Sequence, residues 1–200
     1  MFLLLEKGYS QVETSDNSTD KADEKSANLT SPNKDFEKRT KIKPIAESEN
    51  DVEIRFYVYN LLTRTSQLKI LSLKDGNWKG TLYNELNHPI RRIRKFKLKS
   101  KNGFEELYKS LLQNNLTKLP SQDELKQRMR KVTVTEGWEV EHKFSVTDGQ
   151  SYTVEYKISG NSRIFAFYNP KPYAEFYSDV QELKDYVKIK SLFETELKKK

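Results

Sequence analysis

The sequence predicts an α+β fold in which an antiparallel sheet, built from two meanders, carries helices packed on one face. The first observation is the alternation of apolar and polar residues in two regions, 52–99 and 140–168, because such alternation indicates strands with one buried face. The second is the helical spacing of apolar residues after each region, over 104–112 and 180–197, which is typical of amphipathic helices.

Four strands are expected in the first region. In the first of them, Ile54 and Phe56 alternate with the polar Arg55. A hairpin turn is expected at Asp75 and Gly76, because tight turns between strands need a positive φ, which glycine adopts freely. The four predicted strands cover residues 52–59, 67–73, 78–86 and 90–99.

Two helices should follow the first meander. Phe104, Leu107 and Leu111 lie on one helical face, and Leu119 with Pro120 ends this unit. A short second helix is expected over 121–130, since Ser121 and Glu124 have the spacing of a capping box.

The second meander is expected over 140–168, with His142 as a hydrogen-bonded core residue. Asp148 and Gly149 supply a turn, and Pro170 ends the last strand because proline cannot donate to a ladder. A C-terminal helix should follow from Ser178, with Lys198, Lys199 and Lys200 at its C-terminal end.

The composition divides the chain into three parts. Residues 51–200, which carry 28 Lys/Arg and 19 Asp/Glu, are predicted to form a single α+β domain. Residues 11–50 are expected to be a disordered polar linker, because they offer little to bury. Residues 1–10 have an apolar start and small residues before a polar one, which leaves two interpretations: the remnant of an export signal, or an ordinary terminus.

The whole chain is basic, with a formal net charge of +7, and it contains no cysteine. A disulfide scaffold and a thiolate metal site are therefore excluded. No stretch approaches the roughly 20 apolar residues of a membrane-spanning helix.

Catalytic motifs are missing from the sequence. The two histidines, His88 and His142, have no ligand or catalytic partner at a recognised spacing, and no nucleophilic serine turn or phosphate-binding glycine loop is present. Glu139 and Glu141 share one side of a predicted strand, where a solvated face is the simpler interpretation. No catalytic residue, metal site or cofactor is therefore predicted, although an enzyme with a dispersed site stays as an alternative.

A basic stretch at residues 91–101 is the most specific local feature. It could bind nucleic acid or another polyanion, with Tyr57 and Tyr59 as an aromatic contact face for stacking. The alternative is that lysines alternating with Phe96 and Leu98 guard an edge strand against pairing with another sheet. The basic residues are Arg91, Arg92, Arg94, Lys95, Lys97, Lys99 and Lys101.

Several motifs resemble those of small exported proteins of flavobacteria and related Bacteroidetes, a group of unknown activity. The resemblance covers roughly residues 51–197 and includes the 104–112 helix with Leu119 and Pro120 behind it. The other motifs are the runs 146–152 and 167–170, Tyr173, Tyr177, and the pairs 182–183 and 193–194. The resemblance implies a periplasmic or envelope location, with the cytoplasm as the alternative because a complete signal peptide is missing.

The function expected from these observations is a non-catalytic binding or interaction module of the cell envelope. Its partner would be a protein or a glycan of unknown identity. Binding of nucleic acid or another polyanion through the basic stretch is the second hypothesis, and the oligomeric state does not follow from the sequence.

Overall fold

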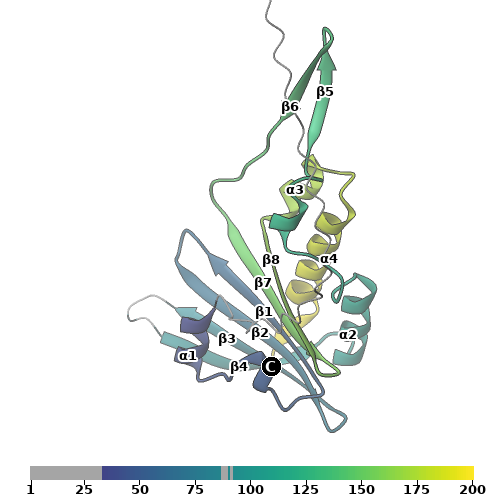
Figure 1. Cartoon of the computed structure of the whole chain (residues 1–200). Coiled ribbons are helices and arrows are strands. Elements are labelled where there is room, and N and C mark those ends of the chain that lie inside the picture. The colour runs from purple at the N-terminus through teal and green to yellow at the C-terminus, as the bar shows by residue number, and fades with distance from the viewer. Residues whose placement is uncertain (1–32, 87–89, 91) are drawn as a thin grey trace, which may run out of the picture.

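The computed structural model describes residues 33–86, 90 and 92–200. Its main feature is a seven-stranded antiparallel sheet in the strand order β8-β7-β1-β2-β3-β4-β9 (Figure 1). The strands are β1 (Val52–Asn60), β2 (Thr65–Lys74), β3 (Asn77–Leu86), β4 (Arg92–Ser100), β7 (Gln150–Ile158), β8 (Asn161–Tyr168) and β9 (Leu197–Lys199). The predicted α+β class, with an antiparallel sheet and helices packed against it, is confirmed.

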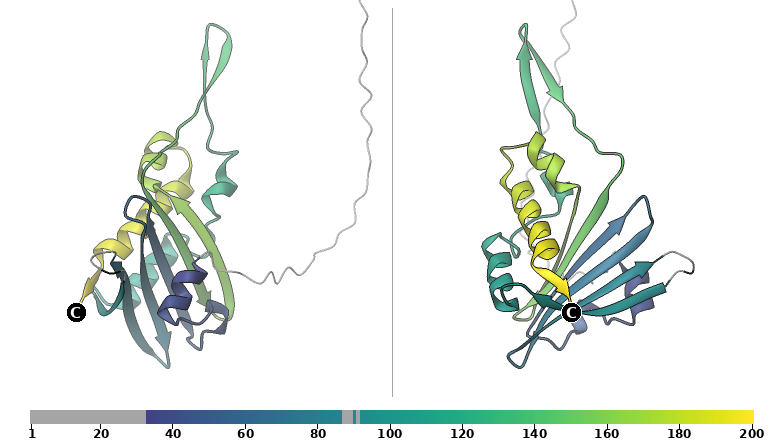
Figure 2. Two further views of the ribbon diagram at one scale, coloured as in Figure 1. Left: turned by 90° about the vertical axis from the view of Figure 1, so that its left-hand side faces the viewer. Right: turned by 180° about the vertical axis from the view of Figure 1, so that it is seen from behind.

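Three helices and one short turn of 3₁₀ helix lie on one face of the sheet. They are α2 (Phe104–Gln113), η2 (Gln122–Leu125), α3 (Pro170–Phe176) and α4 (Gln181–Thr195). The predicted apolar side of the C-terminal helix is buried there, and the Phe193 ring stacks on Phe56 of β1 with 4.4 Å between centroids. Figure 2 shows α4 running along the sheet on this side.

The opposite face is covered near β1 by α1 (Lys34–Thr40) and η1 (Ile45–Glu47). Phe36 and Ile45 are buried, and Phe36 packs with Tyr57 and Leu68 of the sheet. The predicted disordered linker over 11–50 therefore does not hold for residues 33–50, which fold onto the domain. Residues 1–32, which include the predicted export remnant, lie outside the described residues.

The predicted three-stranded second meander also differs from the structure. Its first strand is β6 (Trp138–His142), whose partner among the described strands is β5 (Lys131–Thr135), in a separate two-stranded sheet that projects from the body (Figures 1 and 2). His142 is consequently exposed and not a core residue, and its Nε2 lies 2.8 Å from the hydroxyl of Thr133. Apolar and polar side chains do alternate along β6, but neither face of β6 packs against the hydrophobic core.

The C-terminus forms an edge strand where the sequence predicted the end of a helix. Leu197 is buried, and β9 pairs with residues 98–100 of β4. The backbone N–H of Lys200 donates to the carbonyl of Lys97 at 3.0 Å. The burial of Leu197 and these backbone bonds outweigh the preference of lysines for a helix C-terminus.

The two edges of the sheet are covered to different extents. Along β8, the hydroxyl of Ser121 accepts a hydrogen bond from the N–H of Ala166, and the Gln122 side chain accepts one from the N–H of Tyr168. Along β4, the pairing with β9 reaches only from Ser100 to Leu98. No helix in the described part of the chain has the length and apolar character needed to cross a membrane.

Candidate anion-binding site

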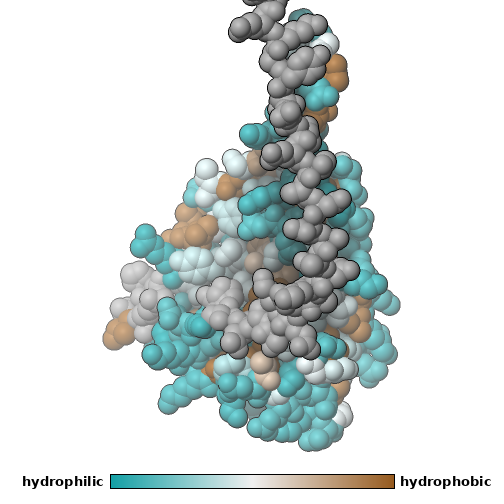
Figure 3. Space-filling view, in the orientation of Figure 1, coloured by the Kyte–Doolittle hydropathy of each residue, from teal (hydrophilic) through white to brown (hydrophobic). Residues whose placement is uncertain are grey.

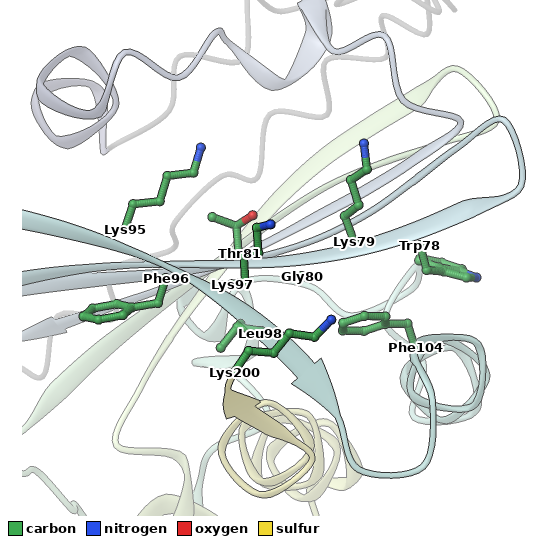
Figure 4. Close-up of a pocket in the computed structure, with 10 residues that line it drawn as sticks. All are labelled: Trp78, Lys79, Gly80, Thr81, Lys95, Phe96, Lys97, Leu98, Phe104 and Lys200. Atoms are coloured by element: carbon green, nitrogen blue, oxygen red, sulfur yellow. The ribbon is translucent and has the colours of Figure 1, made fainter.

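A cavity of about 620 Å³ lies at the β3–β4 side of the sheet. Strands β3 and β4, the first residue of α2 and Lys200 supply its lining, and none of the described lining residues is acidic (Figure 4). Its four cationic side chains are Lys79, Lys95, Lys97 and Lys200. Lys79, Lys95 and Lys97 project to one side of the strands and Lys200 lies on the other (Figure 4), so the side with three lysines is the one suited to an anionic group.

Strand alternation places most of these lysines on one face of the sheet. Lys97 lies opposite Thr81, and Lys95 lies opposite Tyr83, in the β3–β4 register. Directly paired residues share a face, and so do residues two apart along a strand. Lys79, Lys95, Lys97 and Lys99 therefore project from the face that α1 also covers, and we call these four residues the lysine cluster.

The lysine cluster has no neutralising partner among the residues that the structure describes. None of its members forms an ion pair with a described residue, whereas Lys109 of α2, Lys190 of α4 and Lys126 after η2 each pair with a carboxylate three or four positions away. All four ammonium groups belong to exposed residues. Unpaired charges of one sign on neighbouring strands create a local positive potential that attracts anions.

The aromatic part of the cavity lies on the other side of the strands (Figure 4). Phe104 sits directly against Gly80, where an added Cβ would come within 2.8 Å of the ring. The ammonium of Lys199 lies 4.3 Å from the centroid of the Phe96 ring, and the rings of Trp78 and Tyr108 pack with 5.3 Å between their centroids. The rings therefore do not converge with the lysine cluster on one ligand.

The structure divides the predicted basic stretch between two faces. Lys95, Lys97 and Lys99 lie in the lysine cluster, whereas Arg92 and Arg94 share the opposite face with Phe96. Arg91 lies outside the described residues, and Lys101 follows the end of β4. The sequence alone did not indicate Lys79 as a site residue. It joins the cluster because β3 pairs with β4, and the only sign of this in the sequence is its odd-numbered position in the alternating pattern of β3.

The predicted aromatic contact face is not present as a surface. Tyr57 is only 3% exposed and lies beneath α1, while Tyr59 is 36% exposed at the end of the same face. Phe165 and Phe167 are buried on the opposite face, next to α4. Tyr57 is therefore unavailable for stacking on a ligand.

Tyr57 belongs instead to a cluster of buried ionic groups around Arg55. The guanidinium of Arg55 lies 2.8 Å from Glu37 of α1, 2.6 Å from Glu53 and 3.7 Å from Glu155. The Tyr57 hydroxyl donates to Glu37 at 2.5 Å. The arrangement ties α1 to the sheet through a charge and its hydrogen bonds, which is a structural use of these carboxylates.

The two polar groups at the centre of this cluster have altered affinities for protons. Burial lowers the pKa of Arg55, but the neighbouring Glu53 and Tyr57 outweigh burial, so that the pKa is raised. Burial, helped by the negative charge of Glu155, raises the pKa of the Tyr57 hydroxyl. Arg55 therefore stays charged and Tyr57 stays a hydrogen-bond donor at physiological pH.

Other chemistry receives no support from the described residues. Within them, no three side chains of the histidine, cysteine or carboxylate type are placed to hold a metal ion. Glu139 and Glu141 lie exposed on the projecting hairpin. Comparisons of the chain with protein families, with curated proteins and with solved structures give no match. The function therefore has to be argued from the geometry of the site.

Proposed function

We propose that the protein is a non-catalytic binding module that holds a polyanionic partner against the lysine cluster. The observation that carries the proposal is a set of four exposed lysines on two paired strands, none of which pairs with a carboxylate in residues 33–86, 90 and 92–200. An anionic polymer would neutralise several of them at once and release its counterions, which is the main source of free energy in such complexes.

The recognition would depend on charge and not on base stacking. The rings of Phe96 and Phe104 lie on the far side of the strands from Lys79 and Lys95 (Figure 4), and Tyr57 is buried. Sequence-tolerant single-strand binders combine cations and aromatic faces in one groove. The shared chemistry of the expected partners is therefore a row of phosphate, sulfate or carboxylate groups.

The location proposed for this module is the cell envelope, on the basis of the sequence resemblance. A sulfated or phosphorylated envelope glycan would present the required row of anions. The experiment below therefore compares a sulfated glycan with single-stranded DNA.

The test is a fluorescence anisotropy titration of labelled heparin and of labelled single-stranded DNA at several salt concentrations. Replacing Lys79, Lys95 and Lys97 by Gln should weaken binding at least tenfold. For a single strand, it should make the slope of log K against log salt less steep by about 2, because each lost contact contributes about 0.7.

A matched control carries the same change of net charge elsewhere. Lys126, Lys171 and Lys184 are exposed lysines on the helical side of the molecule. Replacing them by Gln should preserve most of the affinity for heparin and for single-stranded DNA. Equal losses in the two triple variants would contradict a localised site. If neither polymer binds at about 150 mM salt, the proposal is wrong, and the lysines serve only to keep the edge strand from pairing with another sheet.

A further inference from the structure

The projecting hairpin β5–β6 exposes an unusual amount of apolar surface. Trp138 is 77% exposed and Val134 is 71% exposed, and apolar residues are visible on the hairpin in the space-filling view (Figure 3). An isolated two-stranded hairpin is marginally stable in water, and exposed apolar residues grouped on one element mark interaction sites. The hairpin is therefore a candidate docking arm.

The strand β6 alternates apolar and acidic side chains. Trp138 and Val140 lie on one face of the hairpin, and Glu139 and Glu141 lie on the other. Thr135 and Trp138 flank the two-residue loop and form a hydrogen-bonded pair with each other in a turn of this kind. Because bonded and non-bonded pairs alternate, the backbone groups of Glu139 and Glu141 point away from β5.

That outer edge of β6 has no partner in the described part of the chain, because the small sheet contains only β5 and β6. The side chain of Glu139 forms no ion pair with a described residue. Glu141 lies 3.4 Å from Arg130, in an exposed pair, and such pairs contribute little to stability. Both carboxylates therefore remain available to a partner.

The strand β4 has a complementary open edge. The N–H of Lys200 donates to the carbonyl of Lys97, and the N–H of Lys101 donates to the carbonyl of Glu196. The odd-numbered residues of β4 therefore direct their backbone groups outward. The ladder with β9 stops at Leu98, so the outward groups of Ile93 and Lys95 have no strand partner among the described residues.

We propose that β6 of one copy of this protein adds as an antiparallel strand to the open edge of β4 in a second copy. In such a pair, outward-pointing residues stand opposite one another. Glu139 and Glu141 then fall on the face of Lys95 and Lys97, and Trp138 falls on the face of Phe96. One register that fits the open edge places Trp138 opposite Phe96, Glu139 opposite Lys95 and Glu141 opposite Ile93.

Charge and geometry favour a second copy as the occupant. Two β4 edges cannot pair with each other, because lysines and arginines would meet, whereas β6 brings carboxylates to the lysines. The hairpin points away from the sheet in all the ribbon views (Figures 1 and 2), so it reaches outward and not back to its own β4. The contact is heterologous, and such contacts produce rings or open chains.

This inference goes beyond the proposed function, although both use Lys95 and Lys97. A polyanion bound to the lysine cluster should compete with the hairpin for these two side chains. The hairpin residues are absent from the anion site, so variants of Trp138, Glu139 or Glu141 test self-association without altering the lysine cluster.

The test is sedimentation velocity of the full chain over concentrations from about 1 to 200 µM at low salt. The native protein should show concentration-dependent association, with a blue shift of the emission of Trp138. Glu139→Lys with Glu141→Lys should abolish it, and so should Lys95→Glu with Lys97→Glu. An equimolar mixture of the two charge-reversed proteins should associate again, because each hairpin then meets an edge of opposite charge.

Two further variants complete the design. Trp138→Ser should weaken association at least tenfold, whereas Lys171→Glu with Lys184→Glu, which reverses two exposed charges on the helical side, should leave it unchanged. A monomer throughout the concentration range would overturn the inference. Association that increases in the Lys95→Glu, Lys97→Glu protein, or a mixture that stays monomeric, would also overturn it. Heparin binding by the hairpin variants reports separately on the proposed function.

Discussion

Replacing Arg55 by methionine should lower the free energy of unfolding by about 3–5 kcal/mol at neutral pH. The guanidinium is fully buried and lies within 4 Å of three buried carboxylates, from Glu37, Glu53 and Glu155. Removing one partner of a buried ion cluster costs about 3–5 kcal/mol, because the remaining charges stay in a medium that solvates them poorly. The side-chain volume is nearly preserved, so a cavity contributes little.

This loss is large for a domain whose total stability is on the order of 5–15 kcal/mol. For a chain of this length it corresponds to a decrease of the melting temperature by about 6–20 °C. The assay is denaturant unfolding followed by circular dichroism, and the control is Arg94→Met, which removes an exposed arginine that has no ion pair with a described residue.

Neutralising the whole cluster separates a charge effect from a packing effect. The variant adds Glu37→Leu, Glu53→Gln and Glu155→Leu to Arg55→Met. A glutamine at position 53 keeps an oxygen for the side chains of Ser48 and Asn50. This variant should recover most of the stability that Arg55→Met loses, because no buried carboxylate then remains without its cation.

Two results would refute this reasoning about Arg55. The first is an Arg55→Met protein within about 1 kcal/mol of the native protein at neutral pH, which would mean that α1 does not depend on the ion cluster. The second is a variant with the whole cluster neutralised that stays as unstable as Arg55→Met, which would assign the effect to packing.

Two other predictions concern the helical side. Phe193→Ala should lower the free energy of unfolding by about 3–5 kcal/mol, because the buried ring stacks on Phe56. The control Glu194→Ala, at an exposed position, should change the denaturation midpoint little. Equal midpoints for the two variants would contradict the packing of α4. Burial by itself would raise the pKa of Glu182, but the hydrogen bonds to its carboxylate and the charge of Arg128 outweigh burial, so that the pKa is lowered. The pair therefore stabilises the fold at neutral pH and loses this effect as the pH falls through the lowered pKa. Arg128→Gln should accordingly be slightly less stable than the native protein at pH 7, and the difference should shrink on acidification.

Local pattern predicted most of the sheet correctly. The alternation of Ile54 and Phe56 with Arg55 predicted β1, and the structure has β1 inside the sheet, between β7 and β2. Asp75 and Gly76 both have positive φ, as the predicted hairpin turn requires. These features depend on neighbours within a few residues, which is why a single sequence contains them.

Features that depend on distant partners were predicted less well. Phe36 and Ile45 are too few to form a recognisable apolar pattern, and the burial of Glu37 depends on Arg55, which lies 18 positions away. The candidate site shows the same division, since the sequence indicated Lys95 and Lys97, but the pairing of β3 with β4 was needed to add Lys79.

The sequence by itself determined the alternation of each strand, the turns and the amphipathic helices, because these follow from the local geometry of the backbone and its side chains. The tertiary structure alone decided what each face meets. It placed β6 on a projecting hairpin, turned the terminal lysines into an edge strand and buried Tyr57 under α1. The physical reason is that alternation specifies two unlike faces, whereas the neighbour of each face is set by long-range strand pairing and by which apolar surfaces remain to be covered.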